Sequence, residues 1–198
     1  TGNVNKAKLS GIDKLAADTT LKAVGGTIAL DNKTAKVKTA DFDAGSTLEL
    51  TVNSSSDYGN LTADTITVAN GATLKATLAQ GIVSSGDPVS LQLLKANNTD
   101  FNNFTDSYDN NMYHFAKADK NGLYTISRTS TAEDVAKANG GTKTNQEAAK
   151  AWVDGEVFSG GIGGKVADGL ADLAQNDGKG FLKALTAAAP NDAPVVQT

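Results

Sequence analysis

Several residue types that carry chemistry in proteins are rare or absent in this sequence. Among its 198 residues there is no cysteine, one histidine and one tryptophan, and the only arginine is Arg128. The lack of cysteine excludes disulfide frameworks and thiolate metal sites, and a single histidine leaves little for zinc. Because the net charge is −4 and 17 of the 18 basic residues are lysine, the composition argues against nucleic-acid binding. Few residues are left for enzyme chemistry.

Long apolar segments are missing as well, since no run approaches the ~20 residues that a membrane-spanning helix needs. Small and short polar residues dominate instead, with 30 alanines, 22 threonines, 20 glycines and 17 asparagines. A chain of this length forms one or two domains whose core removes about 70% of the unfolded surface from water. The sequence begins at Thr1 without a methionine, so we expect a piece of a longer, processed or truncated protein.

Three segments in the first half of the chain align without gaps. Each consists of an apolar residue, four small or polar residues, a threonine and a leucine, and the leucines are Leu21, Leu48 and Leu74, spaced by 27 and 26 residues. Apolar residues alternate with others after each leucine, which indicates a half-buried strand. Strands are expected at residues 21–24, 27–30, 36–38, 48–52, 65–68 and 74–78.

Short strands with a period in the mid-twenties predict a parallel β-solenoid over residues 1–96. Each coil would stack on the next and bury an inward row of Leu, Ile and Val, while the small residues occupy the crowded corners. The alternative is an antiparallel sandwich with similar turns. The expected fold is therefore mainly β: a short right-handed parallel β-helix with an aromatic β-hairpin cap and a C-terminal α-helical segment.

Aromatic residues are concentrated in the segment at 97–130, which holds six of the eleven in the chain. Two strands at 112–117 and 123–128 flank the turn sequence Asp119-Lys120-Asn121-Gly122, so a hairpin is expected there. Extra aromatic area at the end of a solenoid would seal its last coil against water. The residues expected to form this cap and folding nucleus are Phe101, Phe104, Tyr108, Tyr113, Phe115, Tyr124 and Trp152.

Residues 131–189 have a helical pattern. Capping boxes are expected at Thr131–Asp134 and at Thr144–Glu147, and the second opens an alanine-rich helix whose Trp152 would pack onto the coil end. A flexible glycine-rich loop at 159–164 is expected before two further helices, at 165–174 and 181–185. The first of them places three apolar residues on one face, namely Val166, Leu170 and Leu173.

The order of these parts resembles the C-terminal region of an autotransporter passenger, the secreted β-helical portion of a type V secretion protein. The likeness rests on the coil sequence Gly71–Leu74, on the hairpin sequence Asn121–Ser127, and on Phe181–Val196. The last stretch is similar to the helical segment and linker that precede the outer-membrane β-barrel, so residues 190–198 would be a linker toward a barrel absent from this chain. That barrel would be the main partner.

The resemblance implies a protein of the outer membrane or cell surface, or a secreted one, in a Gram-negative bacterium. Its function would be that of a structural scaffold and a folding nucleus for export through the outer membrane. A second hypothesis is an adhesin segment that binds protein or glycan ligands on host or neighbouring cells. A polysaccharide-acting β-helix enzyme is the less favoured third hypothesis, and we expect no enzymatic activity.

Patterns that invite a chemical role are each outweighed by a structural interpretation. The sequence at 160–165 departs from a phosphate-binding loop because Val166 stands where Ser or Thr is required. His114 has no nucleophile motif near it and fits one face of a hairpin strand. We therefore expect no catalytic residue and no cofactor.

Two groups of side chains with carboxylate or amide oxygens remain. One has the composition of a calcium site but lacks the twelve-residue loop and the nonapeptide repeat, so solvated turns are expected; it comprises Asp106, Asp109, Asp119 and Asn121. The other holds the acids that polysaccharide hydrolysis would need, all in turns or outward positions; it comprises Asp41, Asp43, Glu49 and Asp64. No metal site is expected from either.

Overall fold

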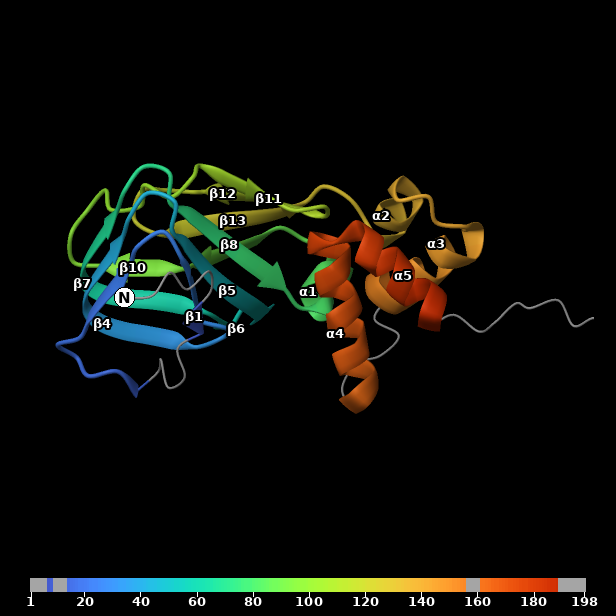
Figure 1. The fold of residues 1–198 in the computed structure, drawn as a ribbon, viewed down its shortest axis with the longest axis horizontal. Helices are drawn as coiled ribbons and strands as arrows, with labels where there is room; N and C mark the ends of the chain where they lie inside the picture. Colours follow the sequence, from blue (N-terminus) through green and yellow to red (C-terminus); the bar gives the residue numbers. More distant parts are fainter. Residues whose placement is uncertain (1–6, 9–13, 156–160, 189–198) are drawn as a thin grey trace, which may run out of the picture.

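The computed structural model describes residues 7–8, 14–155 and 161–188, and divides them into a β part and a helical part (Figure 1). The strands are β1 (Ala7–Lys8), β2 (Thr20–Ala23), β3 (Thr27–Ala29), β4 (Thr34–Phe42), β5 (Thr47–Ser54), β6 (Asp57–Tyr58), β7 (Asn60–Val68), β8 (Thr73–Leu78), β9 (Val89–Gln92), β10 (Leu94–Ala96), β11 (Ser107–Asp109), β12 (Tyr113–Lys117) and β13 (Leu123–Arg128). The helices are α1 (Gln80–Ser85), α2 (Ala132–Ala138), α3 (Lys143–Ala149), the π-helix η2 (Lys150–Asp154), α4 (Gly161–Asn176) and α5 (Gly178–Ala188). The fold is mixed α and β, so the expectation of a mainly β protein underestimated the helices.

Two parallel sheets are built from strands that alternate along the chain. Sheet A contains β1, β3, β5 and β8, and the short β6 joins β5 in antiparallel orientation. Sheet B contains β2, β4, β7 and β10. Within each of these two sheets, with β6 set aside, a strand pairs in parallel with the next strand of the same sheet along the chain. In sheet A, for example, β5 pairs with β8, and Thr47 lies opposite Thr73. This parallel pairing contradicts the antiparallel sandwich for these strands.

The leucine repeat predicts the register of only part of sheet A. Leu48 pairs with Leu74, as the 26-residue spacing requires. Leu21 instead lies in sheet B opposite Ala40, and Ile28 pairs with Leu48 in sheet A. Ile28 and Leu48 are only 20 residues apart, so the first coil of the chain is shorter than the 26–27 residues of the leucine repeat. For this reason the constant leucine spacing assigned Leu21 to the wrong sheet.

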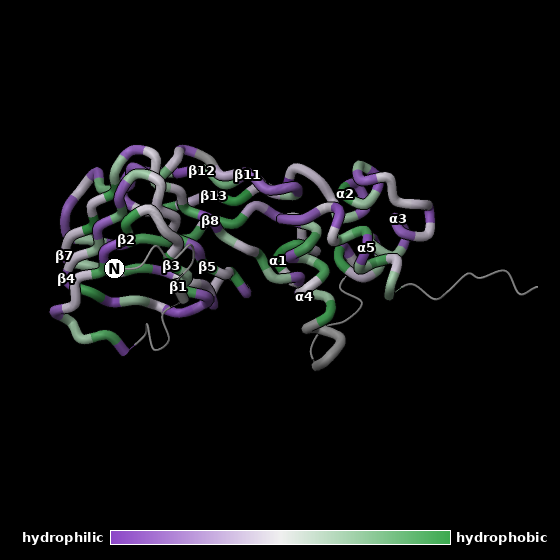
Figure 2. The backbone as a smooth tube through the Cα atoms, in the orientation of Figure 1, coloured by the Kyte–Doolittle hydropathy of each residue, from purple (hydrophilic) through white to green (hydrophobic). Residues whose placement is uncertain are grey.

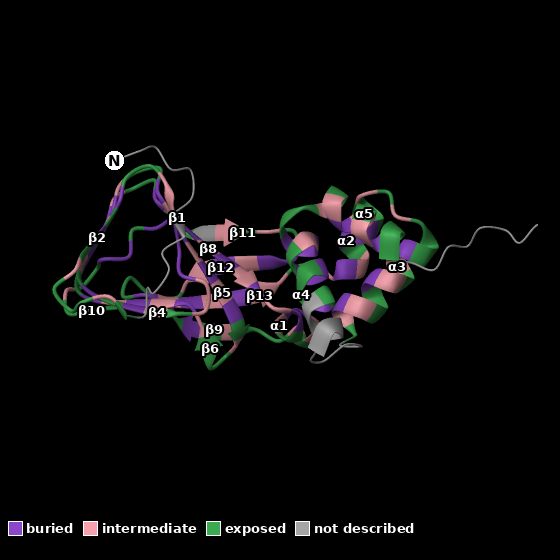
Figure 3. Cartoon of the chain, turned by 60° about the horizontal axis from the view of Figure 1, so that its bottom comes forward, coloured by how far each residue is buried: buried purple, intermediate pink, exposed green. Residues whose placement is uncertain are grey.

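The core of the β part is formed by every second residue of the strands. In β5, Leu48, Leu50 and Val52 are buried while Glu49 and Thr51 between them are partly exposed, and β8 repeats the pattern. Figure 2 shows hydrophobic and hydrophilic residues alternating along the strands, and Figure 3 shows the buried positions. Burying one such aliphatic side chain stabilises the fold by about 1.5–3 kcal/mol.

A third sheet, sheet C, is antiparallel and follows the order β11-β12-β13-β9. Its central hairpin pairs Tyr113 with Arg128 and Lys117 with Tyr124, which confirms the hairpin expected from the sequence. The edge strand β9 pairs with β13. Since β9 lies before residue 97, the cap extends into the region expected to hold only coils.

The helical part begins with two capping boxes, of which one is placed as expected. Thr131 and Asp134 cap α2. The second box is at Thr142, whose hydroxyl oxygen accepts from the backbone N–H of Asn145 at 3.2 Å, so α3 begins earlier than the box predicted at Thr144. Asparagine replaces the expected acid because its side-chain oxygen accepts the same hydrogen bond.

The last two helices, α4 and α5, begin earlier in the chain than predicted. Residues 161–164 belong to α4 instead of a loop, and residues 159 and 160 lie outside the described residues, as does the predicted linker at 190–198. Val166 is 50% exposed, Leu173 is partly buried, and Leu170 packs in the core. The buried face of α4 instead uses small residues, namely Ala167, Ala171 and Ala174. α5 confirms the helix expected at 181–185.

Candidate functional site: the capped end of the parallel sheets

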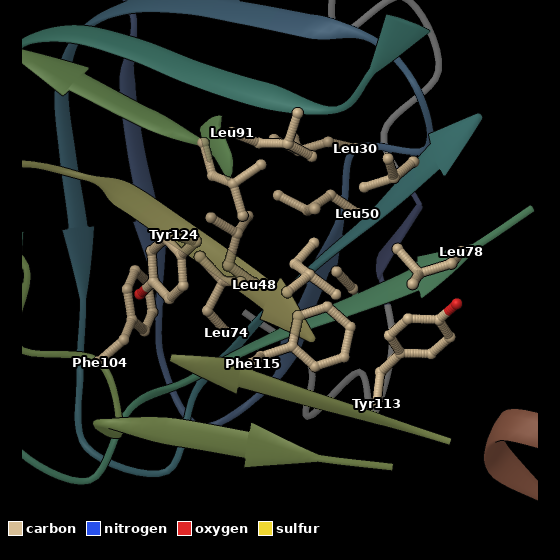
Figure 4. Close-up of a cluster of buried hydrophobic side chains, with 14 of the residues drawn as sticks. Leu30, Leu48, Leu50, Leu74, Leu78, Leu91, Phe104, Tyr113, Phe115 and Tyr124 are labelled. Carbon is tan, nitrogen blue, oxygen red and sulfur yellow. The ribbon is translucent and has the colours of Figure 1, made fainter. Parts of the chain in front are cut away.

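All seven aromatic residues predicted to form the cap contact the hydrophobic core, six of them from residues 101–124 and Trp152 from η2. The buried members are Phe101, Phe104, Tyr113, Phe115 and Tyr124. Tyr108 and Trp152 are partly buried against the same hydrophobic core, and the ring of Tyr108 lies 6.2 Å from that of Phe115. Figure 4 shows labelled cap side chains facing leucines of the parallel sheets, such as Leu48 and Leu74.

The two buried tyrosines use their hydroxyl groups as hydrogen-bond donors. Tyr124 donates to the side-chain oxygen of Asn102 at 3.0 Å, and Tyr113 donates to the backbone oxygens of Ile82 and Val83 at 3.2 and 3.1 Å. Desolvation raises the pKa of Tyr113 to about 12 and raises the pKa of Tyr124 as well. Both phenols therefore stay neutral near pH 7 and serve as structural donors.

The cap attaches to sheet B at the turn of its hairpin. The backbone oxygen of Gly122 accepts from the N–H of Leu93 at 2.9 Å and from that of Leu94 at 3.3 Å. A Cβ atom at position 122 would lie 2.1 Å from the backbone oxygen of Leu94. Only glycine allows this close approach, and its φ of +97° also favours glycine.

Sheet B is continued past β10 by a side chain. β10 pairs with β7 only as far as Ala96, opposite Ala63. Beyond that point the carboxamide of Asn98 takes over, because its oxygen accepts from the N–H of Ile66 at 3.1 Å and its nitrogen donates to the oxygen of Ile66 at 2.9 Å. The side chain thus acts as the peptide group that a further strand would supply.

A carboxylate from η2 holds the start of α2. Asp154 accepts from the N–H groups of Ala132 and Glu133 at 2.9 and 3.1 Å. Burial raises the pKa of Asp154 even though these two hydrogen bonds favour the ionised form. Together with Thr131 and Asp134, this contact satisfies the first three N–H groups of the helix.

The residues considered for calcium are separated by local pairings. Asp106 forms an ion pair with Lys117 at 2.8 Å, which lowers its pKa, and Asp109 pairs with His114 at 2.5 Å. Asp119 accepts from the N–H groups of Asn121 and Leu123 within the hairpin turn. The side-chain oxygen of Asn121 in turn accepts from the N–H of Asp100, so each of these side chains is bonded to a local partner.

The acids considered for polysaccharide chemistry are divided between the two parallel sheets. Asp41 and Asp64 lie in sheet B, Glu49 lies in sheet A, and Asp43 follows β4 in a turn. In the part of the chain that the structure describes, no three His, Cys, Asp or Glu side chains come together to hold a metal ion. His114 is partly exposed and pairs with Asp109.

A cavity of about 140 Å³ lies between α2 and the start of β12. Its lining residues are Asn111, Ser130, Asp134, Val135, Ala138 and Asn139. Asp134 already accepts from the N–H of Thr131, and the Asn111 amide donates to the oxygen of Ala174 at 3.1 Å. Asn139 likewise donates to the oxygen of Val135 at 2.8 Å, so three of the polar side chains in the lining are bound to backbone groups of helices or their caps.

Sequence reasoning missed the side chains that join the parts, namely Asn98, Asn102, Asp154 and Gln175. One of them carries a usable signal: Gln175 is four residues after Ala171, on the face of α4 that packs in the core, where a polar residue needs a specific partner. The asparagines carry no such signal, because asparagine is frequent throughout this chain.

No described helix has the length and apolar character needed to cross a membrane. Comparisons of the chain with protein-family models, with curated proteins and with solved structures found no match.

Proposed function

We propose that this chain is the C-terminal end of an autotransporter passenger and acts as a scaffold and folding nucleus during export through the outer membrane. In this proposal the two parallel sheets are coils of a right-handed parallel β-helix, and sheet C with the helices closes its end. The protein would be non-enzymatic and would function at the surface of a Gram-negative bacterium or after release from it.

The observation that carries this proposal is the difference between the two edges of the parallel sheets. At the C-terminal edge, side chains and loops from residues after 96 occupy the backbone groups, as Asn98 does at Ile66. Thr105 likewise donates its N–H to the oxygen of Ala72 at 3.0 Å. At the opposite edge, β1 and β2 each pair on one side only among the described strands.

Such an arrangement suits directional folding. In a repeat array each unit contacts mainly its neighbours, so folding propagates from whichever end is stable first. The hairpin of sheet C consists of contacts close in sequence, and such contacts form faster than pairings between distant strands. Its aromatic side chains then offer a large apolar surface on which the last coil packs. The edge carrying β1 and β2 would accept preceding coils.

The test is a deletion of residues 101–128 in the full-length protein in its own cell. Loss of both surface display and protease resistance would support a folding nucleus. If display and protease resistance persist while attachment to other cells is lost, the segment is an adhesive surface and the nucleus hypothesis is wrong. Display should be measured by antibody labelling of intact cells, and folding by protease digestion.

Point variants separate the nucleus from a general effect of shortening the chain. Phe104→Ala removes a fully buried ring and should reduce display, whereas Tyr108→Ala trims a partly exposed ring in the same segment and should reduce it less. Equal display of the two variants and the parent would contradict a role for the aromatic core in export.

One observation favours the adhesin hypothesis as a second candidate. Threonines lie in register across three strands in each parallel sheet, as Thr20, Thr39 and Thr65 do in sheet B. Thr20 and Thr65 are exposed, so their hydroxyls are accessible to a ligand. Thr65→Lys should abolish attachment to cells without changing display if this column binds a ligand, and should change neither if it does not.

A further inference from the structure

Asparagine is followed directly by glycine at three places in this chain, with the asparagines at Asn70, Asn121 and Asn139. This dipeptide is prone to deamidation, because the backbone nitrogen of the glycine can attack the side-chain carbonyl carbon of the asparagine. Glycine lacks the Cβ atom that hinders this attack in other residues. The attack needs a carboxamide that can turn toward the next residue and an N–H that no acceptor holds, so the fold decides which pair reacts.

Asn70 meets both conditions. It lies with Gly71 at the centre of the turn between β7 and β8, where the N–H of Ala72 donates to the oxygen of Ala69 at 3.2 Å. Both central residues are exposed, and the φ of Gly71 is +93°, which is typical of the third residue of a type II turn. Among the described residues, the Asn70 side chain has no hydrogen-bond partner and the N–H of Gly71 has no acceptor.

Asn121 is held by two hydrogen bonds in the hairpin turn of sheet C. Its side-chain oxygen accepts from the N–H of Asp100 at 3.1 Å, and its backbone oxygen accepts from the side-chain nitrogen of Gln92 at 2.8 Å. The following residue, Gly122, is buried against the backbone of Leu94. Ring closure at Asn121 would require its side chain to release Asp100 and the peptide group that Gln92 binds to rotate.

Asn139 is held at the C-terminal end of α2. Its side-chain nitrogen donates to the oxygen of Val135 at 2.8 Å. The attacking group is occupied as well, because the N–H of Gly140 donates to the oxygen of Lys137 at 3.0 Å. The Asn139 side chain is partly buried and lies directly beside Gly178, the first residue of α5. Both reacting groups of this pair are therefore bound.

We propose that Asn70 is the site at which the folded chain deamidates, and that the fold protects Asn121 and Asn139. The nitrogen of Gly71 forms a bond to Cγ of Asn70, the side-chain nitrogen leaves as ammonia with the proton of the Gly71 N–H, and a succinimide ring results. Water then adds to one of the two ring carbonyl groups and opens the ring. Opening at Cγ gives aspartate, and opening at the backbone carbonyl gives isoaspartate. The proposal does not rest on the role in export.

The modified residue would lie in a corner that is hydrogen-bonded on both sides. The oxygen of Gly71 accepts from the N–H of Gly45 in the preceding corner at 3.1 Å. The oxygen of Ala72 accepts from the N–H and the hydroxyl of Thr105 in the cap segment, at 3.0 and 3.1 Å. Isoaspartate adds a methylene group to the main chain immediately before these contacts. Both products also add a carboxylate to a chain of net charge −4, so charge separates them from the parent.

The test is incubation of the folded full chain in mildly alkaline buffer, followed by digestion and mass spectrometry of the three Asn-Gly peptides. Asn70 should convert first, and Asn121 and Asn139 about ten- to hundred-fold more slowly, because each must give up two hydrogen bonds. In urea that unfolds the chain, the three rates should become similar. Conversion of Asn121 or Asn139 as fast as Asn70 in the folded chain would overturn the proposal, as would unequal rates that persist unchanged in urea.

Variants identify the residue behind the acidic form of the protein. Asn70→Gln keeps an exposed carboxamide but lengthens the side chain, which disfavours ring closure, so the acidic form should not accumulate on ion-exchange chromatography. Asn97→Gln is the matched control, because Asn97 is also exposed but is followed by Asn98 instead of glycine. It should accumulate the acidic form at the parent rate. Accumulation at the parent rate in Asn70→Gln would overturn the proposal.

Discussion

The rings of Phe42 and Phe104 meet edge to face, with centroids 5.2 Å apart and planes at 62°. Phe42 ends β4 in sheet B, and Phe104 belongs to the irregular segment between β10 and β11. Both side chains are almost fully buried. The contact joins a strand in the middle of the parallel stack to the cap, so the cap reaches past the last strands of the sheets.

Removing the Phe104 ring should therefore destabilise both the cap and the parallel sheets. We expect Phe104→Ala to lower the free energy of unfolding by about 3–5 kcal/mol, through lost burial and the cavity left behind. Urea unfolding followed by circular dichroism measures this. Tyr108→Ala is the comparison in the same segment, and because Tyr108 is only partly buried its loss should be clearly smaller. An equal loss in the two variants would contradict the central position of Phe104.

Gly122, the single glycine of the hairpin, should be highly sensitive to substitution. A Cβ there meets the Leu94 oxygen at 2.1 Å, so Gly122→Ala forces the hairpin turn away from β10 and should destabilise the protein by more than about 4 kcal/mol. Gly140 has a similar φ of +85° with nothing within 4 Å of its Cβ position. Gly140→Ala should thus show only the conformational cost of about 1–2 kcal/mol. Similar unfolding midpoints for the two variants would refute the close approach.

Stability should fall at alkaline pH through Tyr113. Burial raises its pKa to about 12 from 10.0, so the folded protein prefers the neutral phenol. The corresponding stability is complete below pH 10 and is lost as the pH rises through 12, by about 2–3 kcal/mol. Tyr113→Phe removes this titration and should flatten the decline measured by urea unfolding between pH 9 and 12. An unchanged decline would show that Tyr113 does not titrate in this way.

The Asn98 side chain should stabilise sheet B at Ile66, because it makes the hydrogen bonds that a neighbouring strand would make there. Asn98→Ala leaves the N–H and oxygen of Ile66 without their partners, and we expect a loss of about 1–3 kcal/mol in the free energy of unfolding. Asn97→Ala is the control, since the neighbouring Asn97 is exposed and uses its backbone N–H to bond Asp64. Its effect should stay within about 0.5 kcal/mol. The edge role of Asn98 fails if thermal or urea unfolding does not separate the two variants.

Local patterns in the sequence predicted local structure well. The strands at 48–52 and 74–78, the hairpin around Gly122 and the capping box at Thr131 all occur where alternation, turn residues and capping residues indicate them. These features depend on residues close in the chain, so the relevant information lies in a short window. The burial of the aromatic cluster followed in the same way from its apolar composition.

Features that depend on distant residues were predicted poorly. The sheet to which Leu21 belongs depends on the length of the first pass of the chain, which the constant spacing of the leucines conceals. The contact of Gln175 with Leu78 joins residues 97 positions apart, and no local pattern specifies such a pair.

The absence of cysteine and the presence of a single histidine and a single arginine are properties of the sequence alone, and they exclude disulfides and thiolate ligands within it. The sequence by itself also located the change from strands to helices after residue 130, because hydrophobic period and capping residues act locally, but it missed helix α1 between β8 and β9. Only the tertiary structure decided which amides finish the sheets. A buried backbone group must find a partner, and geometry in three dimensions selects Asn98 for Ile66 and Gln175 for Leu78.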